Sequence, residues 1–238
     1  MPDKYARISN SYNGLKPAAK LVPAVLLVLL ALSLFFYKER MLFIDAPHVL
    51  FRIINDGTLQ VAEYRYGSFI TQLFPLLAVK LHLPLVIIML SYSAGFYLFF
   101  LTVALLLVYK FNNYGLAFLL GLYFTLFVSD TFYWPNNEVH QGITWLMLAF
   151  ALYFSFSEAK RTFIMILPLF IVSFALAIWT HPLVIPVALY LWFFHIADTR
   201  KNSYLRVHVS LYSAILLLLA FLKFNQGMHH GYDNTKLE

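Results

Sequence analysis

The sequence predicts an all-α protein: a polytopic transmembrane helical bundle of about seven spans, with interfacial amphipathic helices in its first outer loop. Apolar side chains make up 61% of the 238 residues and charged ones 12%, against about a quarter charged residues in soluble domains. The apolar residues lie in long uninterrupted segments that basic residues flank. Such flanking charges are typical orientation signals of membrane proteins and do not indicate a nucleic-acid partner.

The predicted spans follow from segment length, since a helix needs roughly 20 apolar residues, and at least about 17, to cross a bilayer. Seven segments reach or approach this length: 21–37, 83–109, 114–131, 139–157, 162–180, 182–197 and 207–224. The first follows Lys16 and Lys20, as a cleaved signal peptide would. It is longer than a usual signal sequence and ends in bulky residues, which predicts an uncleaved span.

The charges of the connections predict an N-terminus in the cytoplasm. That orientation puts ten of the 17 basic residues, but only three acidic ones, on the cytoplasmic side, and every short loop agrees with it. The ten are Lys4, Arg7, Lys16, Lys20, Lys110, Lys160, Arg161, Arg200, Lys201 and Arg206. The chain then forms a single membrane domain with a cytoplasmic tail (1–20), an outer loop (38–82), six further spans (83–224) and an outer tail (225–238).

The outer loop 38–82 is the longest connection, and a long loop held against a membrane domain usually carries function. Its first part predicts a helix that begins at Asp45 or Ala46 and stops at Gly57. The pattern is amphipathic, so we expect this helix to lie on the membrane. Its apolar face holds Val49, Leu50, Ile53 and Ile54, and its polar face holds His48, Arg52 and Asn55. Residues 69–81 are too short to span, and they predict an interfacial or re-entrant helix that bends at 83–84.

Asp45 is the first candidate for a functional residue. It lies about five residues after the charged flank of the first span, near the start of a helix whose dipole favours an ionised carboxylate. The alternative is that Asp45 only caps that helix. The second outer loop carries Asp130, Glu138 and His140, which could join Asp45 around one shallow polar site or could simply be solvated. His181 is more typical of a loop histidine than of a ligand.

Metal and nucleotide chemistry have little support in the sequence. There is no Cys, so disulfides and thiolate metal sites are excluded. Oxygen and imidazole ligands suit Mg²⁺ or Mn²⁺, and a divalent-cation site built from Asp45, His48, Glu138 and His140 stays open as an alternative that no spacing specifically predicts. No phosphate-binding glycine loop, HExxH motif, nucleophile elbow or nucleotide fingerprint occurs.

The order of these features resembles the GT-C superfamily of membrane glycosyltransferases, which includes protein O-mannosyltransferases and bacterial lipid A aminoarabinose transferases. The shared order is a short cytoplasmic N-terminus, one span, a long outer loop with an acidic residue soon after the span, and six closely spaced spans. The matching residues are Asp45 in FIDAPH and the stretch RYGSFITQLFPLL, which resembles that family's run into the second membrane helix. Many members have paired acids in this loop, whereas here Asp45 stands alone.

The resemblance implies a glycosyltransferase of the cell envelope, in a bacterial inner (plasma) membrane, that transfers a sugar from a polyprenyl-phosphate donor to an acceptor at the outer face. Asp45 would be the catalytic base, and cationic side chains would hold the phosphate. The residues expected to contact the substrate or the lipid phosphate are His48, Arg52, Arg65, Lys80, Asp130, Glu138 and His140. The family continues with further spans, so the chain is expected to be a truncated, fragmentary or divergent short member.

Two other functions stay open. A non-catalytic membrane assembly subunit needs no site chemistry, and nothing in the sequence alone requires catalysis. A lipid or solute transporter would place ionisable residues near the middle of its spans, and the predicted spans contain almost none. Membrane lipid is an expected partner in all three cases, and nucleic acid in none.

Overall fold

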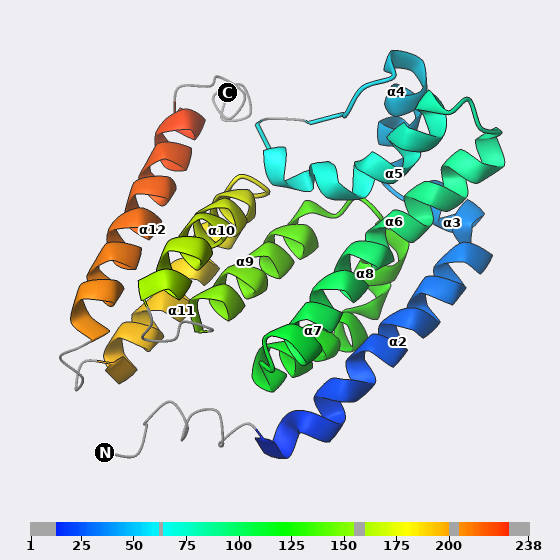
Figure 1. Ribbon diagram of the computed structural model, residues 1–238. Helices are drawn as coiled ribbons and strands as arrows, with labels where there is room; N and C mark the ends of the chain where they lie inside the picture. Colours follow the sequence, from blue (N-terminus) through cyan, green and yellow to red (C-terminus); the bar gives the residue numbers. More distant parts are fainter. Residues whose placement is uncertain (1–12, 62–63, 155–159, 200–204, 229–238) are drawn as a thin grey trace.

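The computed structural model describes residues 13–61, 64–154, 160–199 and 205–228, and in these ranges every regular element is a helix (Figure 1). The prediction of an all-α protein is confirmed. One helix corresponds to each of the seven predicted spans. They are α2 (Lys16–Phe35), α6 (Leu85–Leu105), α7 (Tyr114–Leu126), α9 (Glu138–Phe154), α10 (Lys160–Ile178), α11 (Val184–Thr199) and α12 (Leu205–Met228).

Two helical stretches in the described ranges are long and apolar enough to cross a membrane. They are α2, with a mean hydropathy of 2.4, and the continuous stretch Leu85–Lys110, with 2.0. Shorter apolar helical stretches are Tyr114–Leu126, Ile166–Ile178, Val184–Phe193 and Ser210–Gln226. The core helix of a soluble protein and a signal sequence meet the same criteria, so length and composition alone establish two candidate spans.

The chain turns sharply between α6 and α7. The last turn of α6 widens into the π-helix η3 (Leu106–Lys110), and Asn112 then adopts a left-handed φ of 50°. Asn113 caps the next helix, because its Oδ1 accepts a hydrogen bond from the backbone N–H of Leu116 at 3.1 Å. α7 ends at Leu126, and the short helix α8 (Val128–Tyr133) follows after Phe127.

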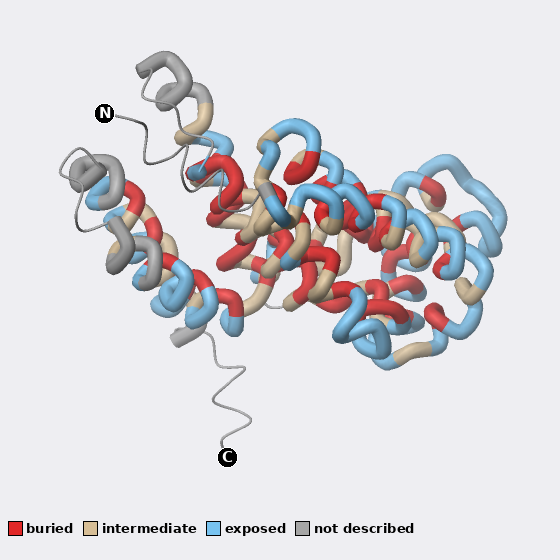
Figure 2. The backbone as a smooth tube through the Cα atoms, turned by 90° about the horizontal axis from the view of Figure 1, so that it is seen from below, coloured by how far each residue is buried: buried red, intermediate tan, exposed pale blue. Residues whose placement is uncertain are grey.

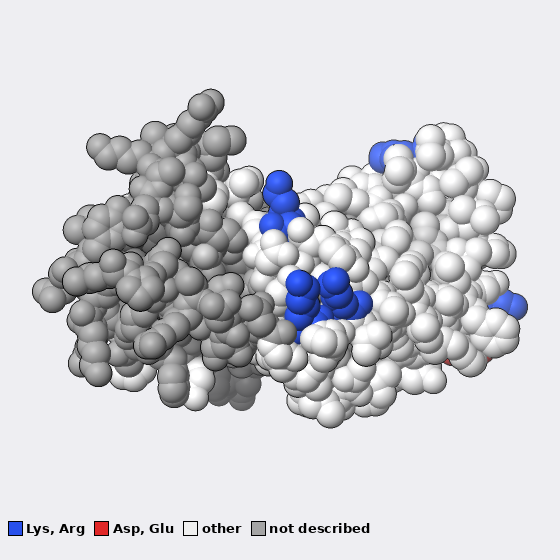
Figure 3. All heavy atoms as spheres, turned by 60° about the horizontal axis from the view of Figure 1, so that its bottom comes forward, with Lys and Arg blue, Asp and Glu red and all other residues white. Residues whose placement is uncertain are grey.

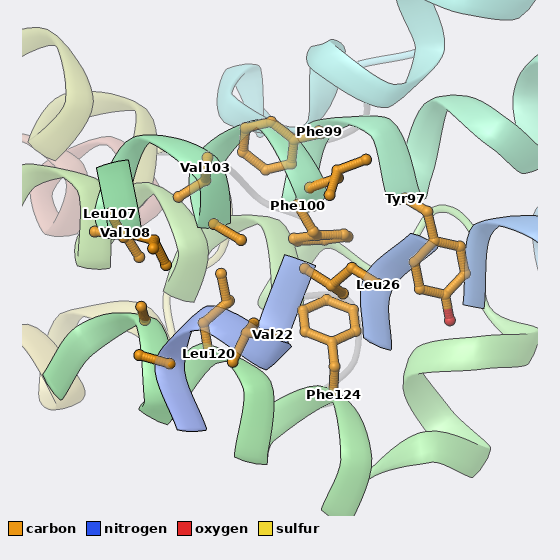
Figure 4. Packing of buried hydrophobic residues seen from close by; sticks show 14 of the residues in the cluster. Val22, Leu26, Tyr97, Phe99, Phe100, Val103, Leu107, Val108, Leu120 and Phe124 are labelled. Carbon is orange, nitrogen blue, oxygen red and sulfur yellow. The ribbon is translucent and has the colours of Figure 1, made fainter. Parts of the chain in front are cut away.

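Buried residues form two large hydrophobic clusters, and Figure 2 marks the buried positions along the backbone in red. The first joins α2, α6 and α7, and Figure 4 shows Leu26, Phe100 and Phe124 facing one another in it. The rings of Phe100 and Phe124 lie 4.4 Å apart, and Gly121 lets α7 approach Val22 on α2. The second cluster belongs to α9, α10, α11 and α12 and is likewise rich in aromatic side chains.

The first loop contains α3 (Tyr37–Met41), α4 (Ala46–Asp56), the 3₁₀-helix η2 (Tyr66–Ser68) and α5 (Phe69–Lys80). The predicted bounds of α4 are confirmed, and Gly57 ends it with a φ of 60°. A turn connects α5 to α6, and Gly95 of α6 packs against the ring of Phe74. α5 is thus a short helix that packs along the first half of α6.

One prediction about α4 is wrong. Its apolar face does not lie open for lipid, because Leu50 and Ile53 are buried, and Leu50 packs with Met41, Ala78 and Tyr92. Ile54 and Phe51 stay exposed. The hydrophobic face predicted from periodicity exists, but α5 and α6 cover most of it.

Candidate functional site

The segments predicted to lie outside the membrane meet at one end of the bundle. Gly67 donates its backbone N–H to the carbonyl of Trp179 at 3.3 Å, so the first loop contacts the end of α10. A Cβ at Gly67 would collide with the hydroxyl of Thr180, which explains why glycine occupies this position. Lys223 of α12 donates to the carbonyl of Tyr64 at 3.3 Å. The loop is therefore fastened to helices far along the chain.

Arg40 in α3 is the most deeply buried charged residue of this end, with no exposed surface. Its Nε donates to the carbonyl of Phe132 in α8 at 2.6 Å, and its Nη1 donates to the carbonyl of Ser93 in α6 at 2.8 Å. The guanidinium also lies against the rings of Phe96, Tyr97 and Phe132, 5.1 to 5.7 Å from their centres. Burial lowers the pKa of Arg40 to about 10, so the group is charged at neutral pH.

Through these bonds Arg40 connects the first and second predicted outer loops. Asp45 follows Arg40 by five residues in the sequence. Nη2 of Arg40 and the hydroxyl of Tyr92 have no hydrogen-bond partner in the described ranges. The Tyr92 hydroxyl lies within electrostatic range of Arg40, Glu138 and Asp45.

Asp45 lies at the N-cap position of α4, as predicted, but its side chain does not cap the helix. Its backbone carbonyl accepts the N–H of Val49 at 2.9 Å, while the carboxylate is exposed and has neither an ion pair nor a hydrogen bond within the described part of the chain. The simple capping interpretation of Asp45 thus has no geometric support. The carboxylate is available to an incoming group.

Glu138, at the start of α9, forms an ion pair with Arg65 of the first loop. Both side chains are partly buried, with relative exposures of 20% for Glu138 and 27% for Arg65. The pairing brings a predicted phosphate-binding cation and a predicted acidic site residue together. It also shows that Glu138 has a cationic partner, whereas Asp45 has none.

A second group of polar side chains surrounds His140 in the first turn of α9. Nδ1 of its buried ring contacts the hydroxyl of Tyr123, and Nε2 lies 3.2 Å from Oδ2 of Asp130, within ion-pair distance but not aligned for a hydrogen bond. Asn137 donates to the same Asp130 oxygen at 3.4 Å and accepts the backbone N–H of His140 at 3.3 Å. A neutral His140 that accepts from Tyr123 carries its ring proton on Nε2, towards Asp130.

The remaining predicted residues lie elsewhere on the loop. His48 is exposed in the first turn of α4, near Asp45. Arg52 pairs with Asp56 at 3.1 Å, and Lys80 lies beside Gly57 at the far end of α4. Eleven helical residues separate the two ends of α4 by about 16 Å. Lys80 thus lies at the end of α4 opposite Asp45, whereas Arg52, seven residues or about 10 Å along the helix from Asp45, is paired with Asp56.

Asp56 is an example of an exposed carboxylate with local partners. Hydrogen bonds from Asn55 and Arg52 lower its pKa below the ordinary value. His181 has a comparable local role, because its Nδ1 accepts the backbone N–H of Leu183 at 3.2 Å. The hydrogen bonds described here for Asp56 and His181 are thus local to their own segments.

The predicted metal ligands do not converge. Within the described ranges, no three His, Asp or Glu side chains lie together as a metal site would require. Asp45 and His48 are on α4, whereas Glu138 is paired with Arg65 and His140 faces Asp130. The alternative of a cation site built from these four residues is not supported.

Comparisons of the chain with protein-family models, with curated proteins and with solved structures give no match. Function therefore has to be argued from the chemistry of the site and from the surface of the helices.

Sequence reasoning missed Arg40, Tyr92 and Tyr123. Arg40 belongs to the charged flank that follows the first predicted span, and basic residues after an apolar segment are usually orientation signals. The choice of Arg at that position was a usable signal, since a guanidinium can bond several carbonyls at once and is favoured over Lys at buried sites. No pattern marks Tyr92 or Tyr123, since both lie in apolar segments rich in aromatic residues.

Proposed function

We propose that this protein crosses the membrane seven times and transfers a sugar from a polyprenyl-phosphate donor to an acceptor hydroxyl at the outer face. Asp45 acts as the general base in this proposal. The observation that carries it is the state of Asp45: an exposed carboxylate without an ion pair or hydrogen bond in the described ranges, in the loop that Arg40, Arg65 and Gly67 fasten to the other predicted outer segments.

The helix surfaces support membrane insertion. In α2, Leu21, Val28 and Phe35 are 64%, 60% and 77% exposed, and in α12, Phe221 and Phe224 are 63% and 64% exposed. Soluble monomers rarely expose large contiguous apolar surfaces. A hydrocarbon environment removes the cost of this exposure, and it suits helices in which polar groups are concentrated at the ends.

The sorting of the helix ends supports seven spans. Contacts join the first loop to α8, to the start of α9 and to the ends of α10 and α12, all of which belong to the predicted outer side. At the other end, Lys16 at the start of α2 lies over the ring of Tyr114 at the start of α7. Helices that alternate in direction give this arrangement, because successive connections between them then lie at opposite ends of the bundle.

The chemistry of sugar transfer suits Asp45 better than its neighbours. A general base must be ionised and within hydrogen-bond reach of the acceptor hydroxyl. Glu138 is paired with Arg65, and Asp130 faces His140 and Asn137, so both carboxylates have competing partners. Arg65, which belongs to the same loop as Asp45 and pairs with Glu138, is the cation that would meet the donor phosphate.

The test is sugar transfer by the full chain in vesicles that contain polyprenyl phosphate linked to a labelled hexose, with glucose, mannose and galactose donors tried in turn. Asp45→Asn keeps the size of the side chain but removes the base, and we expect transfer to fall about 10²- to 10⁴-fold. Asp56→Asn is the matched control, since Asp56 is an exposed carboxylate at the far end of α4. It should keep the wild-type rate.

Two outcomes would contradict the proposal. An inserted Asp45→Asn protein that transfers sugar at the wild-type rate would remove Asp45 from the mechanism and leave Asp130 or Glu138 as the base. A wild-type protein that transfers no sugar from any of the three donors would favour a non-catalytic assembly subunit or a transporter.

A further inference from the structure

The end of the bundle opposite Asp45 carries a group of basic side chains. Lys16 and Lys20 of α2 and Lys110 of η3 are exposed, and we call these three residues the basic patch. Lys16 lies 5.6 Å from the centre of the Tyr114 ring, which brings the start of α2 close to the turn that follows Lys110. Figure 3 brings this end forward and shows Lys and Arg side chains together, with no Asp or Glu among the described atoms beside them.

The ammonium groups of the basic patch have no anionic partner among the residues that the structure describes. No ion pair or hydrogen bond involves Lys16, Lys20 or Lys110 in the described ranges. The starts of α2 and α7 lie at the same end, and the positive ends of their dipoles add to the field there. The local chemistry is thus complementary to a phosphate group.

An apolar stripe continues directly from the basic patch along α2. Leu21 follows Lys20 in the chain, and Val28, Leu32 and Phe35 repeat on the same face at helical spacing, all exposed. From Leu21 to Phe35 the stripe measures about 21 Å. That is more than half of a hydrocarbon core of roughly 30 Å, so it exceeds the depth that the acyl chains of one leaflet fill.

We propose that the basic patch and the apolar stripe together bind an anionic phospholipid, with its phosphate at Lys16, Lys20 and Lys110 and its acyl chains along α2. Free phosphate or another soluble anion would use the lysines alone and leave the stripe unexplained. The inference rests on the proposed membrane insertion of α2, but it is independent of sugar transfer. It names a lipid contact on the side of the membrane away from Asp45.

The test measures which lipid the purified full chain retains. The protein is reconstituted in nanodiscs of equal phosphatidylglycerol and phosphatidylcholine, released into a neutral detergent, and its bound lipids are counted by native mass spectrometry. We expect phosphatidylglycerol to be retained in preference. Each lysine near an anionic surface strengthens binding roughly fivefold. In the triple variant Lys16→Gln, Lys20→Gln, Lys110→Gln, the preference for phosphatidylglycerol over phosphatidylcholine should therefore fall about a hundredfold.

The single variant Lys20→Gln has a matched control at the opposite end, Lys38→Gln, whose side chain is also exposed. The control variant should retain phosphatidylglycerol as the wild type does. Glycerol 3-phosphate, which carries a phosphate without acyl chains, should not displace the lipid at equal concentration.

Three results would overturn the inference. They are an unchanged preference in the variant of the basic patch, an equal loss in the control variant, or displacement by glycerol 3-phosphate. Extraction with alkaline carbonate tests membrane insertion separately. If carbonate removes the protein from membranes, the protein is not inserted, and the proposed function fails as well as the lipid contact.

Discussion

Arg40 shows how one buried side chain organises the polar end. It reaches from α3 to α6 through Ser93 and to α8 through Phe132, and α8 carries Asp130. A guanidinium suits this position because its planar fork can donate to two carbonyls while its faces rest on aromatic rings. Arg40 therefore holds α3, α6 and α8 together just before the helix that begins after Asp45.

This role predicts that Arg40→Met lowers the free energy of unfolding by about 2–3 kcal/mol, because Met fills the space but leaves the carbonyls of Phe132 and Ser93 without donors. For a chain of this size the thermal midpoint in detergent should fall by about 5–10 °C. Lys38→Met is the control, since Lys38 is exposed two residues earlier. A midpoint that rises with Arg40→Met would mean that burial of the charge costs more than its hydrogen bonds contribute.

At the residue scale, sequence reasoning identified Asp45, Glu138 and Arg65 but not their relations. Polar residues in a long loop are conspicuous because little else is polar in this chain. The pairing of Arg65 with Glu138 joins residues 73 positions apart, and no local pattern encodes such a contact. The same holds for Tyr123 and His140, whose contact depends on how α7 packs on α9.

At the scale of elements, α4 is the clearest case. Its start and its end at Gly57 were predictable from turn chemistry, since glycine adopts the left-handed φ of 60° at little cost. What covers its apolar face was not predictable, because periodicity identifies an apolar face without saying whether lipid or protein lies against it. Here α5 folds back along α6, and α4 packs on both through Leu50.

Two neighbouring residues test this packing. Leu50 is 5% exposed and Phe51 is 65% exposed. Leu50→Ala should destabilise the protein by about 2–4 kcal/mol, because it leaves a cavity among Met41, Ala78 and Tyr92. Phe51→Ala should stay within about 0.5 kcal/mol in thermal unfolding. Equal, small effects at both positions would mean that α4 lies on the membrane surface without contacting α5 and α6.

At the scale of the whole molecule, the chain has two clusters of aromatic side chains and two chemically different ends. The clusters divide the helices into α2, α6 and α7 on one side and α9 to α12 on the other, with Trp145 and Leu148 of α9 packing against both. The number and order of these helices were predictable from the apolar segments. Their division into two clusters was not predictable, because these helices are apolar on all sides. Periodicity then does not indicate which helices pack against one another.

The charge pattern makes the orientation testable. Lys16, Lys20 and Lys110 lie at one end, and Asp45, Asp130 and Glu138 belong to the other, so we expect the basic end in the cytoplasm. Reporter fusions after Phe111 and after Lys201 should therefore report the cytoplasm, and fusions after Asn136 and at the C-terminus should report the outer side. The fusion after Phe111 is decisive, because it follows α6 directly. With the N-terminus in the cytoplasm, an outer signal there would require an odd number of crossings before Phe111 and an even number before Asn136. α5 and α6 would then cross as a pair, and the seven-span arrangement would be wrong.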